Sequence, residues 1–197
     1  MRKVCCFNSN KMNIVKQTLG NKNYAHYSTA LLLKTYTEGS NRLRHCLEGL
    51  TEVDLKAKPI PEKWSIAEII IHLADGEMIG SCRIRQAYTN HAGPFPYYDQ
   101  AVWADSMRYQ NQSVEFINLN LEMFDILRKT TANLLTGFNE ADWAKTGLHP
   151  ERGEMTIRGL LELYADHSER HIEQILKRRN LLGKPLEMEL ILKDRLY

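Results

Sequence analysis

Apolar residues recur at intervals of three or four along four stretches of the chain, which is the spacing of a helix with one buried face. These stretches cover residues 24–50, 65–88, 113–137 and 156–180. Proline and glycine interrupt the pattern in the segments between them. The pattern therefore predicts an all-α fold built from four long helices.

Two pairs of segments resemble each other in register. Residues 64–75 align with residues 155–166 at an offset of 91, and residues 50–55 align with residues 138–143 at an offset of 88. Two matches that differ only by a three-residue insertion are difficult to attribute to chance. We therefore interpret the two halves of the chain as copies of one helical hairpin.

Two similar hairpins that pack about a pseudo-two-fold axis form a four-helix bundle. The connection between the second and third helices, residues 89–112, contains prolines and aromatic residues and is too long for a tight turn. A crossover of this length allows the second and third helices to run parallel. We therefore predict an up-down-down-up bundle in which the second and fourth helices are antiparallel.

The composition is that of one ordinary globular domain. The chain has 197 residues, of which 43% are hydrophobic and 25% are charged, and this is enough for a sizeable core. No apolar run approaches the ~18 residues that a membrane span needs, so we expect no membrane partner. The four cysteines form no C-x-x-C pair, which favours the cytoplasm as the compartment.

The net charge of +2 is unevenly distributed. Residues 1–23 contain five basic and no acidic side chains, so the remainder carries 21 basic and 24 acidic side chains, a net charge of −3. A mildly acidic body argues against a nucleic-acid partner. We divide the chain into a basic, flexible tail at 1–23, the bundle at 24–180 and a C-terminal extension at 181–197, where alternating charged and apolar residues favour a short helix from 186.

The fourth predicted helix carries two histidines, His167 and His171, one turn apart on its apolar face. Two imidazoles at this spacing can hold one transition-metal ion as adjacent ligands, although hydrogen-bonded or solvated histidine pairs are also common. Burial of both rings without partners would be costly. Asp166 and Glu169 lie off this apolar face, so we expect both carboxylates to be solvated.

A third ligand candidate is His72, which lies in a strongly apolar part of the second helix. Antiparallel packing of the second and fourth helices would bring His72 near the level of the other two histidines. The alternative is a core histidine bonded to a backbone carbonyl or to Glu68. In the internal alignment the counterpart of His72 is Leu163 and that of His167 is Gly76, so the site would be asymmetric.

Four further residues are candidates for supporting roles. Glu68 could orient the His72 ring, or it could complete a capping box with Ser65 at the start of the second helix. Tyr97, Tyr98 and Trp103 could line a substrate pocket, or they could pack the crossover onto the bundle.

The sequence KWSIAEIIIHLADGE at 63–77 and the sequence HSERHIEQI at 167–175 resemble those of the DinB/YfiT-like family, in particular its DinB-2-type members. The resemblance covers roughly residues 28–180. It implies an up-down-down-up four-helix bundle that is often a homodimer. It also implies a divalent metal held by His72, His167 and His171.

The activities assigned within that family imply metal-dependent S-transfer with low-molecular-weight thiols such as bacillithiol, mycothiol or glutathione, and related isomerase chemistry. Three imidazoles would leave a divalent ion with open positions, where the pKa of a bound thiol or water falls. Imidazole ligands suit Zn, Ni or Fe. The expected function is thus a thiol S-transferase acting on a small molecule, with a metal-dependent hydrolase or a non-catalytic metal-binding or dimerisation module as alternatives.

Overall fold

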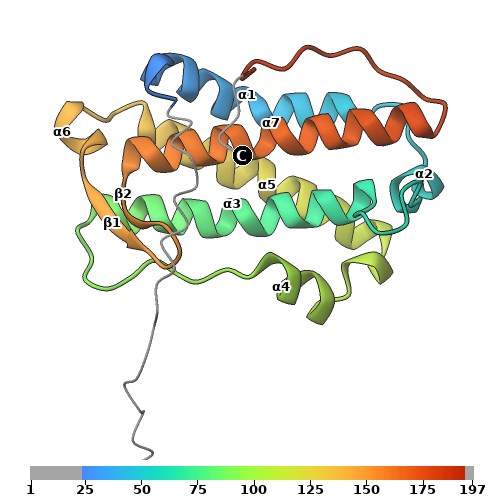
Figure 1. Ribbon diagram of the computed structural model, residues 1–197, viewed down its shortest axis with the longest axis horizontal. Coiled ribbons are helices and arrows are strands. Elements are labelled where there is room, and N and C mark those ends of the chain that lie inside the picture. Colours follow the sequence, from blue (N-terminus) through green and yellow to red (C-terminus); the bar gives the residue numbers. More distant parts are fainter. Residues whose placement is uncertain (1–23, 194–197) are drawn as a thin grey trace, which may run out of the picture.

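The computed structural model describes residues 24–193, and the basic tail predicted at 1–23 lies outside the described residues. Four long helices form the bundle (Figure 1). They are α1 (Thr29–Leu47), α3 (Ile66–Tyr88), α5 (Val114–Leu135) and α7 (Ile157–Leu181). The predicted all-α four-helix bundle is confirmed, and no helix within 24–193 has the length and apolar character that a membrane crossing requires.

Each long helix begins at a serine or threonine whose side chain accepts a hydrogen bond from a backbone N–H of the first turn. These N-caps are Ser28, Ser65, Ser113 and Thr156. The first helix starts later than predicted, because residues 24–26 form a separate 3-10 turn, η1 (Tyr24–His26). The caps thus fix where the bundle helices start.

Side-chain contacts between helices establish their directions. Arg158 of α7 contacts Thr29 near the start of α1, and Arg179 contacts Cys46 near its end, so α1 and α7 are parallel. In contrast, Arg83 near the end of α3 donates to Tyr164 in the first half of α7, so these helices are antiparallel. Contacts of α5 with α3 and α1 complete the up-down-down-up order that the sequence predicted.

The internal duplication is visible in two short helices, α2 (Glu52–Lys56) and α6 (Glu140–Trp143). Each precedes a long helix, and each begins with a capping box, formed by Thr51 with Asp54 and by Asn139 with Asp142. These cap residues are 88 positions apart, as in the sequence alignment. The two hairpins therefore share their entry signals as well as their topology.

Two connections contain more structure than the sequence indicated. The segment 138–155, expected to be a loop, includes an antiparallel hairpin of β1 (Thr146–His149) and β2 (Gly153–Thr156). The crossover after α3 contains α4 (Gln100–Ser106) and η2 (Tyr109–Asn111) and lies along α3 (Figure 1). Phe95 at its start donates its backbone N–H to Leu148 of β1, which joins the crossover to the hairpin.

One buried ion pair connects all four long helices. Arg128 of α5 is fully buried and donates to the Glu77 carboxylate of α3, with an Nη2–Oε2 distance of 2.7 Å. The same guanidinium donates to the Tyr36 carbonyl of α1 and to the Ser168 hydroxyl of α7. Such a network is favourable only while every member keeps its partners.

The prediction that Asp166 and Glu169 are solvated was wrong, because they are only 1% and 2% exposed. Asp166 accepts a hydrogen bond from the Tyr24 hydroxyl. Glu169 accepts from Arg42 of α1 and from the backbone N–H of Ile191. The histidine face of α7 is therefore not its only buried face.

The C-terminal segment, residues 184–193, covers this second face of α7. It runs back along the bundle (Figure 1). Within its described residues, 184–193, it does not form the short helix that was expected from residue 186. Its backbone N–H groups at Ile191 and Leu192 bind the Glu169 carboxylate, and Leu192 is buried in the core. Because these backbone groups bind outside the segment, they are not available for a helical turn.

Candidate metal centre

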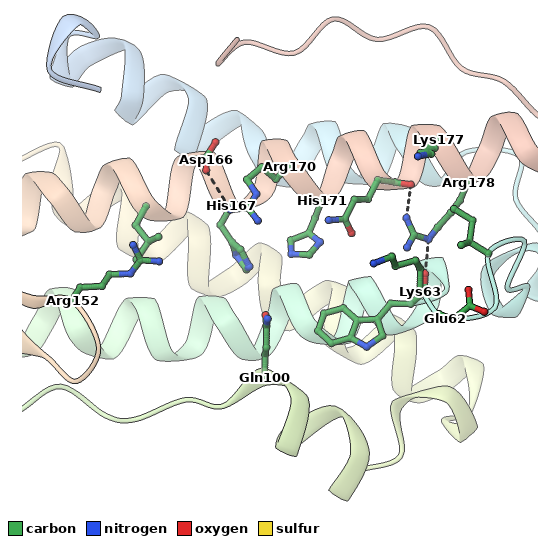
Figure 2. A pocket seen from close by; sticks show the side chains of 14 residues that line it. Glu62, Lys63, Gln100, Arg152, Asp166, His167, Arg170, His171, Lys177 and Arg178 are labelled. Atoms are coloured by element: carbon green, nitrogen blue, oxygen red, sulfur yellow. Dashed lines mark hydrogen bonds and ion pairs between the residues drawn. The ribbon is translucent and has the colours of Figure 1, made fainter. Parts of the chain in front are cut away.

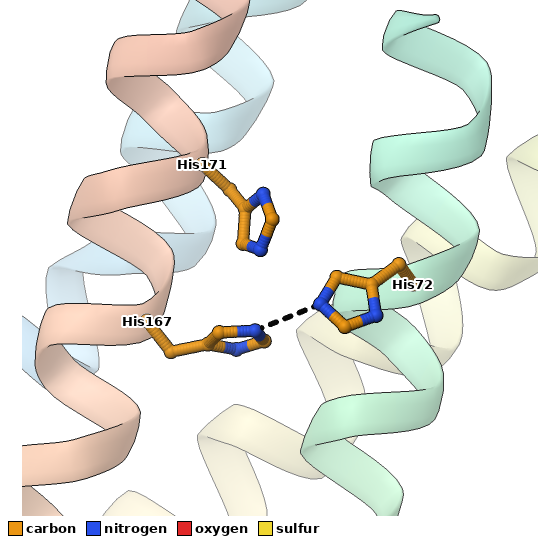
Figure 3. Close-up of side chains that lie close together, drawn as sticks. All are labelled: His72, His167 and His171. Atoms are coloured by element: carbon orange, nitrogen blue, oxygen red, sulfur yellow. Dashed lines mark hydrogen bonds between the residues drawn. The ribbon is translucent and has the colours of Figure 1, made fainter. Parts of the chain in front are cut away.

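The structure brings the three predicted histidines together between α3 and α7 (Figure 3). One ring nitrogen from each of His72, His167 and His171 lies within 4.8 Å of the others. The Nε2 atoms of His72 and His167 are 2.9 Å apart, and the His171 ring centroid is 4.7 Å from those of both other rings. Three nitrogen donors from two helices thus converge on one point.

Small residues on α3 leave room for the rings of α7. A Cβ atom on Gly76 would lie 3.0 Å from Cε1 of His167, and a Cβ atom on Gly80 would lie 2.6 Å from the Tyr164 ring. In the internal alignment Gly76 is the counterpart of His167 itself. The position that carries a ligand in the second hairpin therefore provides the space for that ligand in the first.

The histidines are held in their neutral form. Burial lowers the pKa of His72 to about 4, with a further contribution from the positive charge of Arg170. Burial also lowers the pKa of His167 and His171 well below the usual value, and His72 adds to the effect on both. Neutral imidazole is the form that binds metals. His171 Nδ1 is buried and has no hydrogen-bond partner within the described part of the chain.

A chain of hydrogen bonds supports His72 from behind. Its Nδ1 lies 3.0 Å from the Tyr98 hydroxyl, Tyr98 bonds to Tyr109, and the Tyr109 hydroxyl donates to the buried carboxylate of Asp75. If Nδ1 carries the proton and donates it to Tyr98, the Nε2 lone pair faces the other two histidines. These hydrogen bonds therefore favour the tautomer in which His72 can act as a ligand through Nε2.

The other predicted supporting residues have different surroundings. Glu68 completes the capping box with Ser65 and pairs with Lys58, and its hydrogen bonds in the described structure do not reach His72. Tyr97 is 61% exposed, and the Trp103 ring packs against Tyr98 with their centroids 4.9 Å apart. Of the three aromatic candidates, Tyr98 is the one that touches a histidine.

His167 and His171 line a cleft of about 780 Å³ (Figure 2). Leu163, His167 and His171 of α7 line the cleft together with Trp64, whose ring lies against His72 with their centroids 4.7 Å apart. Gln100 is the crossover residue that reaches the cleft within the described chain. The cleft is also lined by basic residues that the sequence pattern did not single out: Lys63, Arg152, Arg170, Lys177 and Arg178.

Two known proteins are similar to this chain in sequence. A protein of Bacillus cereus (strain G9842), named as a proposed metal-dependent hydrolase, is 27% identical over 176 residues, which cover 87% of this chain and 99% of that protein. A protein of the same name from Oceanobacillus iheyensis is 30% identical over 112 residues, which cover 57% of this chain and 63% of the relative.

Two solved structures are similar in fold. One is YfiT from Bacillus subtilis, described as a proposed metal-dependent hydrolase with an unusual four-helix bundle topology. It superposes with a TM-score of 0.73 at 19% sequence identity, and the superposition covers 83% of this chain and 93% of the YfiT chain. The other is the mycothiol-dependent maleylpyruvate isomerase, which superposes with a TM-score of 0.62 at 11% sequence identity. This superposition covers 76% of this chain and 61% of the isomerase chain.

The family profile of the DinB superfamily matches residues 35–175, a range that begins within α1, ends within α7 and contains α3, α5 and all three histidines. This match covers well over half of the chain and agrees with the resemblance carried by the two histidine segments. The chain belongs to the DinB superfamily.

Proposed function

We propose that this protein is a metal-dependent enzyme acting on a small molecule, with a divalent Zn, Ni or Fe ion held by His72, His167 and His171. The observation that carries the proposal is the convergence of three neutral ring nitrogens within 4.8 Å, beside an open cleft that His167 and His171 line. The donor set fits such an ion, since three imidazoles are a common ligand set for catalytic metals. His171 Nδ1, which has no hydrogen-bond partner among the described residues, supports the proposal, because buried polar atoms are usually satisfied.

The reaction that we favour is thiol S-transfer. A divalent ion with an open position lowers the pKa of a thiol or water bound to it, so that a nucleophile is available near neutral pH. The protein's own contribution is to orient His72 through Tyr98 and to hold the substrate in the cleft. The shared fold of the mycothiol-dependent isomerase supports this choice.

A metal-dependent hydrolase on the same site is the second candidate, and the names of the sequence relatives favour it. Hydrolysis by a metal-bound water is often assisted by a nearby carboxylate base. Asp166 and Glu169, two carboxylates beside the ligands on α7, are instead bound to Tyr24 and Arg42. This arrangement favours thiol chemistry, in which the bound thiolate is itself the nucleophile.

Thiol dependence distinguishes these reactions. Metal-loaded protein would be incubated with a chromogenic aryl halide and a panel of thiols, and we expect an S–C bond to form, halide to leave and the thiol proton to pass to solvent. Turnover should require the thiol. Thiol-independent cleavage of an ester panel would instead support the hydrolase, and a metal-loaded protein inactive in both assays would leave the metal-binding or dimerisation module as the function.

Substitution of Tyr98 by phenylalanine should weaken metal binding by about 10–100-fold, the range typical when an outer partner of a metal-bound histidine is lost. The substitution removes the hydroxyl that fixes the His72 ring and leaves the aromatic packing against Trp103 in place. Metal affinity would be measured by competition with a chromogenic chelator. Tyr97→Phe is the matched control, because Tyr97 is largely exposed. Equal affinities for the two variants would exclude the positioning role of Tyr98.

We also propose that the protein is a cytoplasmic homodimer. The cytoplasm is supported by Cys46 and Cys82, which are free thiols in the structure. The homodimer is supported by the family resemblance and by Leu119 and Ile126, two apolar side chains of α5 that are more than half exposed. Sedimentation velocity on the purified protein would give the mass of the assembly and would contradict this proposal if only the monomer were found.

A further inference from the structure

Asp75 lies one turn after His72 on α3, and the two side chains are joined through the crossover by a series of hydrogen bonds, here called the Asp75 network. The network leaves α3 at His72, passes through the Tyr98 and Tyr109 hydroxyls, and returns to α3 at Asp75. We propose that Asp75 is a positioning residue for the metal centre, whose carboxylate sets the direction of these hydrogen bonds and thereby keeps the proton of His72 on Nδ1. Because it concerns His72 as a metal ligand, the inference rests on the function proposed above.

The number of protons gives the Asp75 network its direction. An ionised carboxylate only accepts hydrogen bonds, and a tyrosine hydroxyl has a single proton to donate. The Tyr109 hydroxyl donates its proton to Asp75, so its oxygen accepts from Tyr98. The proton of Tyr98 is then also in use, so the Tyr98 oxygen accepts from His72, whose Nδ1 must carry the proton.

Burial keeps the two phenols protonated. Burial raises the pKa of Tyr98 and Tyr109, and the negative charge of Asp75 raises both further, so each hydroxyl retains its proton at neutral pH. Burial also raises the pKa of Asp75 itself, while the hydrogen bond from Tyr109 opposes that rise by stabilising the charged carboxylate. Two neutral phenols therefore connect His72 to the carboxylate.

The direction matters because the other ring nitrogen of His72 faces the remaining histidines. Nε2 of His72 lies 2.9 Å from Nε2 of His167, and Nδ1 points away from that contact (Figure 3). A hydrogen bond between two imidazole nitrogens needs a proton on one of them, and the contact alone is compatible with either. A proton on Nε2 of His72 would block the atom that coordinates a metal. The Asp75 network removes this ambiguity, because it places the proton on Nδ1.

The internal duplication contains this carboxylate twice. Asp75 aligns with Asp166 at the offset of 91. Each carboxylate accepts a hydrogen bond from a buried tyrosine hydroxyl, since Tyr109 donates to the first and Tyr24 to the second. A carboxylate paired with a phenol is thus common to both hairpins and fastens a neighbouring segment to each. The extension through Tyr98 to a metal ligand is what gives the first pair a positioning role.

Nitrogen NMR of the metal-free, full-length protein with labelled histidine would test the inference. The chemical shifts of Nδ1 and Nε2 show which of the two atoms carries the proton. The protein has seven histidines, so the signals of His72 would be assigned by their loss in His72→Gln. We expect His72 of the unmodified protein to carry its proton on Nδ1, and the opposite tautomer would overturn the inference.

Two variants alter the Asp75 network at different points. Asp75→Asn places an amide at its end, which donates as well as accepts, so the direction is no longer fixed. The same replacement at the buried aspartate of serine proteases leaves the geometry intact and gives the histidine the wrong tautomer. Tyr109→Phe removes the acceptor of the Tyr98 proton, which can then be donated to Nδ1 of His72. Both variants should populate the Nε2-protonated tautomer of His72.

The change of tautomer should also be visible in metal affinity. Asp75→Asn and Tyr109→Phe should each weaken metal binding by about tenfold, the lower end of the range for an outer partner of a metal-bound histidine. Asp105→Asn is the matched control, because it makes the same chemical change at an exposed position of α4 in the same crossover. It should change neither the tautomer nor the affinity.

A purely structural role of Asp75 would give a different result. Loss of such a role would lower the free energy of unfolding and leave the proton of His72 on Nδ1. An unchanged tautomer in Asp75→Asn or in Tyr109→Phe would therefore overturn the inference, and either variant is sufficient if the other does not fold.

Failure of this inference can be distinguished from failure of the proposed function. The tautomer is measured without metal, and metal content is measured separately after metal loading. A protein whose tautomer depends on Asp75 but which binds no metal would retain the positioning role and lose the enzymatic proposal. A protein that binds metal through the histidines, with a tautomer independent of Asp75, would retain the metal site and contradict the positioning role.

Discussion

Replacement of His167 by alanine should abolish stoichiometric binding of divalent metal. The ring supplies one of the three nitrogens that converge on the site within residues 24–193, and its Nε2 lies 2.9 Å from that of His72. Two remaining imidazoles would leave the ion with fewer protein ligands than the three that are usual in catalytic sites. The loss in affinity should therefore exceed the roughly 10–100-fold expected for an outer partner such as Tyr98.

The measurement is metal content by mass spectrometry on protein purified without a polyhistidine tag. His91→Ala is the matched control, because His91 is exposed in the crossover. His72→Ala and His171→Ala should behave like His167→Ala, and circular dichroism should show that all the variants remain helical. Unchanged metal content in the three histidine variants would remove the basis of both enzymatic proposals.

Substitution of Arg128 by methionine should lower the free energy of unfolding by about 3–5 kcal/mol, the cost of removing one partner from a buried ion pair. The change leaves the Glu77 carboxylate buried, with its hydrogen bond from the Tyr36 hydroxyl but without its counter-charge. It also removes the hydrogen bonds that Arg128 donates to the Tyr36 carbonyl and the Ser168 hydroxyl. Methionine keeps much of the volume, so the loss reports mainly on the polar network.

Urea unfolding followed by circular dichroism would give this free energy, measured on metal-free protein so that metal binding does not contribute. The neighbouring Lys129→Met is the control, since Lys129 is 65% exposed and its surface pair with Asp125 should contribute at most about 1 kcal/mol. A double-mutant cycle with Glu77→Gln would separate the pair from its surroundings. Additive effects of the two substitutions would show that the pair is not coupled.

The sequence predicted the features that depend on local pattern. Helix starts follow from caps such as Ser65 and Thr156, and the bundle order follows from the duplication and the long crossover. The juxtaposition of the three histidines required only that the second and fourth helices be antiparallel. Local pattern and simple packing rules were sufficient here because a bundle helix contacts its neighbours along its whole length.

Buried polar groups were harder to predict. Arg128 lies between Phe124 and Thr131 at intervals of four and three, so its position on the apolar face was visible in the sequence. The charge of Arg128 favours an exposed position, because arginine is rarely fully buried without a partner. That partner, Glu77, lies on another helix, where the local pattern does not reveal it. The same reasoning failed for Glu169, whose partners Arg42 and Ile191 are both distant in the sequence.

The β-hairpin was missed for a different reason. Each strand has four residues, which is too short for an alternating pattern to be distinguished from a loop. The end of the turn leaves a signal, because Gly153, the first residue of β2, has a φ of +76°, which glycine adopts without strain. The hairpin also places Arg152 beside the cleft, so a segment expected to be a loop contributes to the site.

The division of the three histidines between the two hairpins has a consequence for how such a centre could arise. His72 comes from the first copy and His167 and His171 come from the second, while the matching positions hold Leu163 and Gly76. A pair of identical, separate hairpins related by a two-fold axis would repeat every ligand, so a centre on that axis would always have an even number of them. Three ligands at one centre on such an axis therefore require two copies whose sequences differ, as the two halves of this chain do.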